Sequence, residues 1–251
     1  MYQWQVVPIC RRQRLDVRSE DLLQGGLYRK CDILRTKFDD GFLKYARLYN
    51  MDVEPVEFIV QLYGCPLSCW YCYVTRSGVW GGYRLISTNE LVNSYEESSC
   101  RTFHLMGGAP ALYLDHWPEL AHAVIKMGGI FRSDFLLIEG KYSKEVLRQL
   151  LHKNTLFCVS IKGLASEEFL RNTGVRLSKT YLMRMRRNFD RIYESGINFY
   201  ITVTGCSRSN VDKFKEWLAA KYGDGMVGKV HEIKIVRYKA LGLGDEGERG
   251  W

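Results

Sequence analysis

The feature that most constrains this chain is a regular alternation of two kinds of segment between residues 57 and 238. Short apolar segments, rich in β-branched or aromatic residues, alternate with longer segments that have helical spacing. Units of this kind form parallel sheets with right-handed connections, so we predict an α/β protein built as an open doubly wound sheet or as a barrel. The short segments predict six strands, at Glu57–Tyr63, Thr102–Met106, Asp134–Glu139, Thr155–Lys162, Asn198–Thr204 and Lys229–Arg237.

The longer segments begin with residues that are typical of helix starts. Ser87 and Glu90 have the spacing of a capping box, which predicts a helix that runs to about Ser98. Further helices are predicted to begin at Asp115, Ser143, Ser166, Ser178 and Asn210.

The helix predicted from Ser178 to Ser195 has a clear apolar stripe, with Gly196 in the position of a terminating glycine. Because residues at spacings of three and four share one helix face, the stripe is predicted to be buried. It consists of Leu182, Met185, Phe189 and Ile192. Arginines occupy the other faces, which predicts either a solvated surface or an anion-binding one. They are Arg184, Arg186, Arg187 and Arg191.

The alternation divides the chain into three parts. Residues 57–238 form the predicted core domain, and 251 residues in all suit a single α/β barrel. Residues 1–56 form an N-terminal extension with one predicted helix near Gly41–Tyr49, and residues 239–251 form a glycine-rich tail.

Composition gives the class of protein and its expected location. With 46% hydrophobic and 25% charged residues, the chain is an ordinary globular protein. It has no apolar segment long enough to cross a bilayer, and no apolar region follows Arg11, Arg12 and Arg14 as a secretory signal would require. We therefore expect a cytoplasmic protein with no membrane partner. Its net charge of +8 favours anionic partners, although solubility alone would explain it equally well.

Three of the eight cysteines lie within eight residues, directly after the first predicted strand: Cys65, Cys69 and Cys72. In this architecture, ligands bind at the carboxyl ends of the strands. Reduced thiols are expected in a chain of this size without an export signal, so a close cysteine cluster indicates metal binding or catalysis. Structural zinc and electron-transfer clusters usually take four protein ligands, whereas three thiolates on a four-iron cluster leave one iron open for another ligand.

The spacing Cys-x3-Cys-x2-Cys after the first strand resembles the signature of the radical SAM superfamily. The resemblance implies a partial (β/α)6 barrel of parallel strands and a [4Fe–4S] cluster whose open iron binds S-adenosylmethionine (SAM). It also implies reductive cleavage of SAM to a 5′-deoxyadenosyl radical, an oxidoreductase-like enzyme, and an electron donor such as flavodoxin or ferredoxin.

The same resemblance implies several SAM contacts. Tyr71 occupies the aromatic position before the last cysteine, which lies near the adenine in the family. Met106-Gly107-Gly108-Ala109-Pro110 is similar to the family's Gly-Gly-Glu-Pro segment, whose backbone receives the SAM amino group, and glycine allows such a close approach. Ala109 stands where the family has its acidic residue.

Two further segments end at the same predicted edge. Ser160-Ile161-Lys162 resembles the Asp-Leu-Lys segment of glycyl-radical-enzyme activases, which implies that Lys162 approaches SAM, with Ser160 in place of the aspartate. Glu139, at the end of the third predicted strand, is expected to position the ribose or the amine. Weaker candidates are Thr202, Thr204 and His231. Among the other cysteines, Cys158 is expected to be buried, Cys206 is left open, and no second metal spacing occurs.

These observations leave the substrate open. An activase-like reaction on a protein glycine is the first hypothesis, because of Lys162, and modification of RNA or of a phosphorylated metabolite is the second, because of the positive charge. A hypothesis of another class is a non-catalytic metal module. It would hold zinc with His104 or Cys100 as fourth ligand, or would be a degenerate relative that keeps only the cluster.

Overall fold

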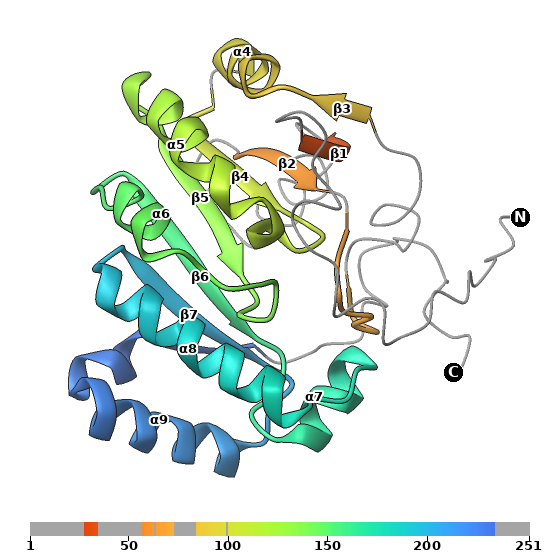
Figure 1. The fold of residues 1–251 in the computed structure, drawn as a ribbon, viewed down its shortest axis with the longest axis vertical. Helices are drawn as coiled ribbons and strands as arrows, with labels where there is room; N and C mark the ends of the chain where they lie inside the picture. Colours follow the sequence, from red (N-terminus) through yellow and green to blue (C-terminus); the bar gives the residue numbers. More distant parts are fainter. Residues whose placement is uncertain (1–27, 35–56, 63, 73–83, 99, 234–251) are drawn as a thin grey trace, which may run out of the picture.

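The computed structural model describes residues 28–34, 57–62, 64–72, 84–98 and 100–233. Its centre is an eight-stranded sheet in the order β3-β1-β2-β4-β5-β6-β7-β8 (Figure 1). The predicted helix near residues 41–49 and the tail at 239–251 lie outside the described residues. The strands are β1 (Tyr28–Leu34), β2 (Phe58–Leu62), β3 (Arg84–Ile86), β4 (Thr102–Met106), β5 (Ile130–Phe135), β6 (Thr155–Ile161), β7 (Phe199–Thr204) and β8 (Val230–Ile233).

Six neighbouring strands, β2 and β4 to β8, run parallel. This confirms the predicted α/β fold with six parallel strands in the manner of a partial barrel. Sequence analysis did not predict β1 or β3, which extend one edge: β1 pairs antiparallel with both β2 and β3.

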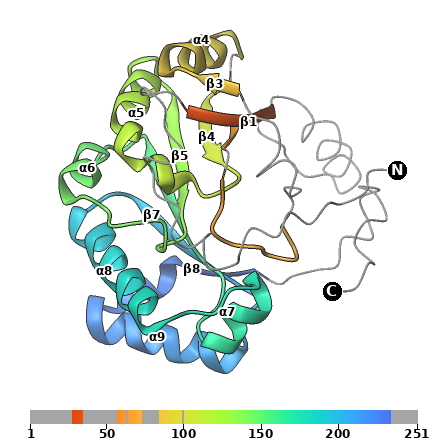
Figure 2. The same cartoon turned by 45° about the vertical axis from the view of Figure 1, so that its right-hand side comes forward.

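Helices cover the outer side of the curved sheet (Figures 1 and 2). They are α4 (Thr88–Ser98), η2 (Pro110–His116), α5 (Trp117–Lys126), α6 (Lys144–Gln149), α7 (Ser166–Thr173), α8 (Lys179–Ser195), α9 (Arg208–Tyr222) and η3 (Asp224–Lys229). None of the helices in the described ranges is both long enough and apolar enough to cross a membrane.

Local sequence determines where several of these helices begin and end. The capping box at α4 forms as predicted, because the Ser87 N–H donates to the Glu90 carboxylate (2.8 Å) and the Glu90 N–H donates to the Ser87 hydroxyl (3.2 Å). Ser178 caps α8, and Gly196 ends it with φ = 75°. The last long helix begins slightly earlier than predicted, because Ser207 rather than Asn210 is its cap.

The third predicted strand, Asp134–Glu139, is wrong in position. The strand is β5, Ile130–Phe135, and its side chains alternate between half-buried and buried. The apolar run Leu136–Ile138 is buried in the loop that follows, where Leu137 has φ = 69°. Polar residues such as Arg132 and Asp134 hid the strand, because they face the polar inner side of the sheet.

Two helix predictions also need correction. The helix expected at Asp115 begins at Trp117, and the preceding residues form the 3-10 segment η2. Leu182 is 37% exposed, so the buried stripe of α8 rests on Phe189 and Ile192. Met185 is half-buried and packs against the core, as does Tyr181 in the first turn of α8.

The core lies between the sheet and the helices and is rich in aromatic rings. The Trp117 ring stacks on Phe157, with ring centroids 5.8 Å apart, and also packs against Phe131 and Phe135. The inner face of the sheet, away from the helices, carries polar side chains that include His104, Arg132 and Tyr200. In parallel α/β barrels, ligands bind at the carboxyl ends of the strands, so that end of the sheet is where a site is expected.

Candidate functional site

The three-cysteine loop lies at the carboxyl edge of the sheet. It follows β2 and reaches across the end of the barrel toward α7 (Figure 2). There the Ser68 N–H donates to the Thr173 carbonyl at 2.9 Å. The loop is therefore attached at both sides of the barrel opening, by β2 at its start and by α7 at its middle.

The three thiols lie close enough to influence one another. Cys65 and Cys69 are half-buried against the apolar core, and Cys72 is exposed. Burial raises the pKa of Cys65, and the neighbouring Cys69 thiolate raises it further. Burial also raises the pKa of Cys69 to about 11, although the Lys162 ammonium acts in the opposite direction. A cation bound among the three sulfurs would relieve this repulsion between thiolates.

Three cysteines in one loop are compatible with the ligand set of a four-iron cluster. Within the described ranges, no three His, Cys, Asp or Glu side chains converge on one point as a single metal ion requires. In a four-iron cluster, each thiolate binds a different iron. The predicted fourth zinc ligands are also misplaced. Cys100 precedes β4, so it lies at the amino ends of the strands, whereas the cysteine loop lies at their carboxyl ends. The His104 Nδ1 lies 2.7 Å from the Glu57 carboxylate.

The Gly107-Gly108 segment packs against the start of the cysteine loop. Both residues have positive φ, of 70° and 59°. A Cβ atom on Gly108 would lie 2.5 Å from the Gly64 carbonyl oxygen and 2.6 Å from that of Leu62. The Ala109 N–H donates to the same Gly64 carbonyl at 2.8 Å. The turn after β4 and the entry to the cysteine loop therefore form one tightly packed unit.

Lys162 and Tyr71 meet beside Cys69. The Lys162 Nζ lies 5.9 Å from the centre of the Tyr71 ring, and burial together with the Cys69 thiolate raises the Tyr71 pKa. Ser160, two residues before Lys162, accepts a 3.4 Å hydrogen bond from the Thr202 hydroxyl. Thr202 also lies 3.3 Å from the Cys158 thiol, which is buried as predicted.

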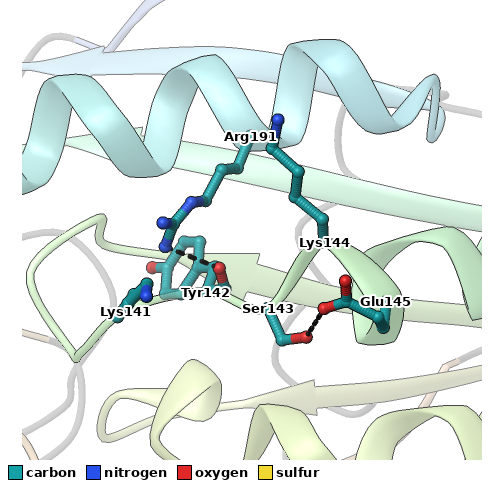
Figure 3. Close-up of a pocket in the computed structure, with 6 residues that line it drawn as sticks. All are labelled: Lys141, Tyr142, Ser143, Lys144, Glu145 and Arg191. Atoms are coloured by element: carbon teal, nitrogen blue, oxygen red, sulfur yellow. Dashed lines mark hydrogen bonds between the residues drawn. The ribbon is translucent and has the colours of Figure 1, made fainter.

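Glu139 belongs to a buried loop close to Cys65. Its carboxylate accepts hydrogen bonds from the Leu136 N–H (2.8 Å) and the Tyr142 hydroxyl (2.6 Å), and burial raises its pKa. Arg191 on α8 donates to the Tyr142 carbonyl (2.8 Å), and both residues line a surface cavity of about 360 Å³ (Figure 3). The loop that carries Glu139 is thus held from both sides.

Sequence analysis missed two residues that hold the strand ends together. The Asn172 side-chain amide donates to the carbonyls of Lys162 (2.8 Å) and Thr204 (3.0 Å). Glu168 accepts from the N–H of Ser207 (2.7 Å) and from the side chain of Asn210. Neither role can be read from local sequence, because these hydrogen bonds join residues from 10 to 42 positions apart.

A cavity of about 580 Å³ opens beside the cysteine loop. Trp70, Cys206 and the ends of β7 and β8 line it, together with Arg171 and Arg208. Cys206, which sequence analysis left open, therefore faces a cavity. Thr204 is buried at the end of β7, whereas His231 is exposed and packs edge-on against Tyr200, so these candidates do not form one group.

The inner side of the sheet carries a chain of charged side chains that sequence analysis did not identify. Arg132 donates to the Glu57 carboxylate and to the Tyr200 hydroxyl, both at 2.6 Å. His104 lies between Glu57 (2.7 Å) and Asp134 (3.8 Å). Burial acts to raise the pKa of Glu57, but His104 and Arg132 outweigh it and lower the pKa to about 2. The chain links β2, β4, β5 and β7 across the barrel.

Comparisons with known proteins agree with this geometry. The model of the radical SAM superfamily matches residues 59–219, well over half of the chain. No curated protein sequence gives a significant match. Among solved structures, TYW1 with a lysine-pyruvate adduct bound is similar with a TM-score of 0.54 and 14% identity, over 96% of this chain and 83% of that one.

Two other solved structures share the fold. SuiB from Streptococcus suis, bound to S-adenosylmethionine, has a TM-score of 0.51 and 14% identity, over 78% of this chain and 43% of its own. Native anSMEcpe with bound AdoMet has a TM-score of 0.50 and 16% identity, over 72% and 52%. The chain thus spans about half the length of these two proteins. From the family match, we conclude that the chain belongs to the radical SAM superfamily and, like its members, uses a [4Fe–4S] cluster and SAM.

Proposed function

We propose that Cys65, Cys69 and Cys72 bind the [4Fe–4S] cluster and that the chain is an enzyme that cleaves SAM reductively. The observation that carries the proposal is the position of three cysteines in one short loop at the carboxyl ends of the strands, with the Gly107-Gly108 turn packed at the start of that loop. When bound, the reduced cluster supplies the electron that splits SAM into methionine and a 5′-deoxyadenosyl radical, which abstracts hydrogen from the substrate.

The surrounding residues suit the binding of SAM. The Gly107-Gly108 backbone receives the amino group, because no side chain stands in the way. The cavity lined by Gly205 and Cys206 takes the adenosine. The Tyr71 ring lies near Cys206 and near the Lys162 ammonium. Ser160 and Glu139 complete the proposed contacts from the ends of β6 and of the loop after β5.

For the substrate, we propose hydrogen abstraction from the Cα of a glycine in a protein. Lys162 supports this, because it stands in the activase-like segment and lies near Cys69. A second candidate is an anionic substrate such as RNA or a phosphorylated metabolite. The stretch from Arg171 to Phe189 favours it, because it contains six Lys or Arg residues and no Asp or Glu.

The cofactor proposal is tested by anaerobic reconstitution of the wild type, Cys69→Ala and the control Cys100→Ala. We expect roughly four irons per chain and dithionite-dependent 5′-deoxyadenosine in the wild type and the control. In Cys69→Ala, we expect at least ~100-fold less 5′-deoxyadenosine, because three thiolates are needed to hold the cluster. Wild-type yield from Cys69→Ala, or zinc in place of iron in the wild type, would refute the assignment.

The substrate proposal is tested with candidate proteins or peptides whose glycines carry deuterium at Cα. Transfer of deuterium into 5′-deoxyadenosine is expected if glycine is the site of abstraction. Transfer from a deuterated ribose or base of RNA, with none from glycine, would replace the first candidate by the second.

A further inference from the structure

The cavity of about 360 Å³ at Tyr142 lies between the loop after β5 and the helices α6 and α8, which cover the outer side of the sheet (Figures 1 and 3). Three of the six side chains that line it are cationic: Lys141, Lys144 and Arg191. Figure 3 shows Arg191 reaching from α8 to Tyr142, with Lys141 on one side of that residue and Lys144 on the other. None of the lining residues is a proposed contact of the cluster or of SAM.

Hydrogen bonds hold the floor of this cavity in place. The Tyr142 side chain is buried, and its hydroxyl donates to Glu139 at 2.6 Å and accepts from the Leu137 N–H at 3.0 Å. The Tyr142 N–H donates to the Asn188 side chain at 3.2 Å, and the Tyr142 carbonyl accepts from Arg191 at 2.8 Å. A site whose groups are fixed before a ligand arrives loses less entropy on binding, so this cavity is preorganised.

The cations of the cavity keep hydrogen-bonding capacity for a ligand. A guanidinium has five N–H donors, and the Tyr142 carbonyl takes one of those of Arg191. Lys141 is exposed, and among the described residues no carboxylate forms an ion pair with its ammonium. Both side chains can therefore donate to an anion in the cavity.

Two carboxylates lie close to these cations, and both have partners. The Glu194 carboxylate lies 2.5 Å from the Lys144 ammonium. Glu145, which lines the cavity, accepts a 2.7 Å hydrogen bond from the Ser143 hydroxyl. The pairing of Lys144 with Glu194 leaves two cations, Lys141 and Arg191, against the single charge of Glu145.

The neighbouring helix turns add positive charge. Arg187 lies one turn before Arg191 on α8, and Arg148 lies one turn after Lys144 on α6. Both arginines are exposed. Because residues four positions apart share a helix face, they extend the positive surface beside the cavity.

We propose that this cavity binds the phosphate group of a small phosphorylated molecule, with Arg191 and Lys141 as its donors. The planar fork of a guanidinium matches two phosphate oxygens, and a volume of about 360 Å³ is within the range of small-molecule sites. A small molecule is favoured over an RNA strand, because Glu145 and Glu194 would repel the next phosphates of a strand. The inference goes beyond the proposed function, since the site takes a second ligand and not the substrate.

The test measures binding to the cluster-loaded protein by isothermal titration calorimetry. The probe is ribose 5-phosphate, and ribose is its counterpart without the phosphate. The main variant is Lys141→Glu, whose side chain makes no hydrogen bond or ion pair within the described residues, so the variant is expected to fold. The matched control is Lys153→Glu, which makes the same charge change at an exposed loop lysine that does not line the cavity.

The wild type and Lys153→Glu should bind ribose 5-phosphate equally, and at least ~10-fold more tightly than ribose. Lys141→Glu should bind it at least ~10-fold more weakly than the control. Arg191→Lys keeps the charge and a donor for the Tyr142 carbonyl but loses the fork, so it should also bind more weakly. Glu145→Gln should bind roughly threefold more tightly, because a repulsive charge is removed.

Equal affinities in Lys141→Glu and Lys153→Glu would overturn the proposal, as would the absence of binding to the wild type at about 10 mM probe. A short single-stranded RNA is titrated as well. If the RNA displaces ribose 5-phosphate from the wild type and binds much more tightly, the cavity belongs to a nucleic-acid phosphate and the small-molecule proposal fails. None of these measurements requires cleavage of SAM, so failure of the proposed function would leave their outcome unchanged.

Discussion

Gly108 shows most clearly how a single residue can determine the shape of the site. Its φ of 59° is strained for other residues, and the carbonyl oxygens of Leu62 and Gly64 occupy the space that a side chain would need. Sequence reasoning assigned this glycine to close approach by a ligand. The structure adds a second cause, because the turn must also come within contact of the cysteine loop.

We expect Gly108→Ala to be markedly less stable than the wild type, since the new Cβ would lie within 2.6 Å of two backbone oxygens. The matched control is Gly128→Ala, where φ is 81° and no atom lies within 4 Å of the added Cβ. The control should cost about 1 kcal/mol in free energy of unfolding, and Gly108→Ala about 2–4 kcal/mol. Urea unfolding measures both, and equal losses would show that the close approach is not real.

Among the helices and strands, α7 is held against its neighbouring loops by the buried carboxylate of Glu168. Glu168 is 5% exposed and accepts hydrogen bonds from Leu164, Ser207 and Asn210, so it joins the loops after β6 and β7. Burial acts to raise its pKa, but these hydrogen bonds outweigh burial and lower it to about 2. Because the pKa is lower in the folded state than in the unfolded state, the carboxylate stabilises the fold at pH values above the unfolded-state pKa. This stabilisation is lost as the pH falls toward the folded-state pKa.

Glu168→Gln should therefore lower the free energy of unfolding by about 2–3 kcal/mol at pH 7. The difference from wild type should shrink by about 1 kcal/mol at pH 3.5, because the stabilisation by the wild-type carboxylate begins to fall as the pH drops below 4.5, the usual pKa of a glutamate. Glu167→Gln, on the exposed side of the same helix turn, is the control and should change little. A pH-independent difference for Glu168→Gln would contradict this account.

The inner chain of charges makes the opposite prediction for pH. Burial acts to lower the pKa of His104, but the charges of Asp134 and Glu57 and the hydrogen bond to Glu57 outweigh burial and raise it. The stabilisation by this imidazolium is therefore complete below the unfolded pKa of about 6.5 and is lost as the pH rises through the folded value.

We expect the free energy of unfolding of the wild type to fall between about pH 6 and pH 9, and that of His104→Gln to fall less over the same range. At pH 6, His104→Gln should have a free energy of unfolding about 1–3 kcal/mol lower than the wild type. His122→Gln, on the exposed side of α5, serves as the control and should leave the pH profile unchanged. Thermal or urea unfolding across this range provides the measurement. Parallel profiles for the wild type and His104→Gln would show that the residue does not titrate as described.

The whole molecule shows which features can be inferred from sequence alone. Six parallel strands were predictable, because their apolar runs alternate with capped helices. β1 and β3 were not, because their place depends on pairing at the sheet edge rather than on local pattern. The strand that corresponds to β5 was predicted too late in the sequence, because Leu136–Ile138 form a buried loop that is more apolar than the strand itself.

The residues of the candidate site also fall into two groups, those that the sequence predicts and those that only the structure reveals. Cys65, Cys69, Cys72, the double glycine and Lys162 could be named from motif and spacing, and the structure brings them to one edge. Asn172 and the Glu57–His104–Arg132 chain could not, because their hydrogen bonds join residues far apart in sequence. The residues proposed to bind the cluster and SAM could be predicted from the sequence, whereas the residues that hold the strand ends together required the fold.

The central claim is that three thiolates leave one iron free to bind SAM. Electron–nuclear double resonance on the reduced wild type, loaded with SAM whose amino group carries nitrogen-15, tests this most directly. The account predicts a nitrogen-15 coupling to the cluster that disappears when unlabelled SAM is used. Absence of any coupling, in a sample where dialysis shows SAM to be bound, would contradict it.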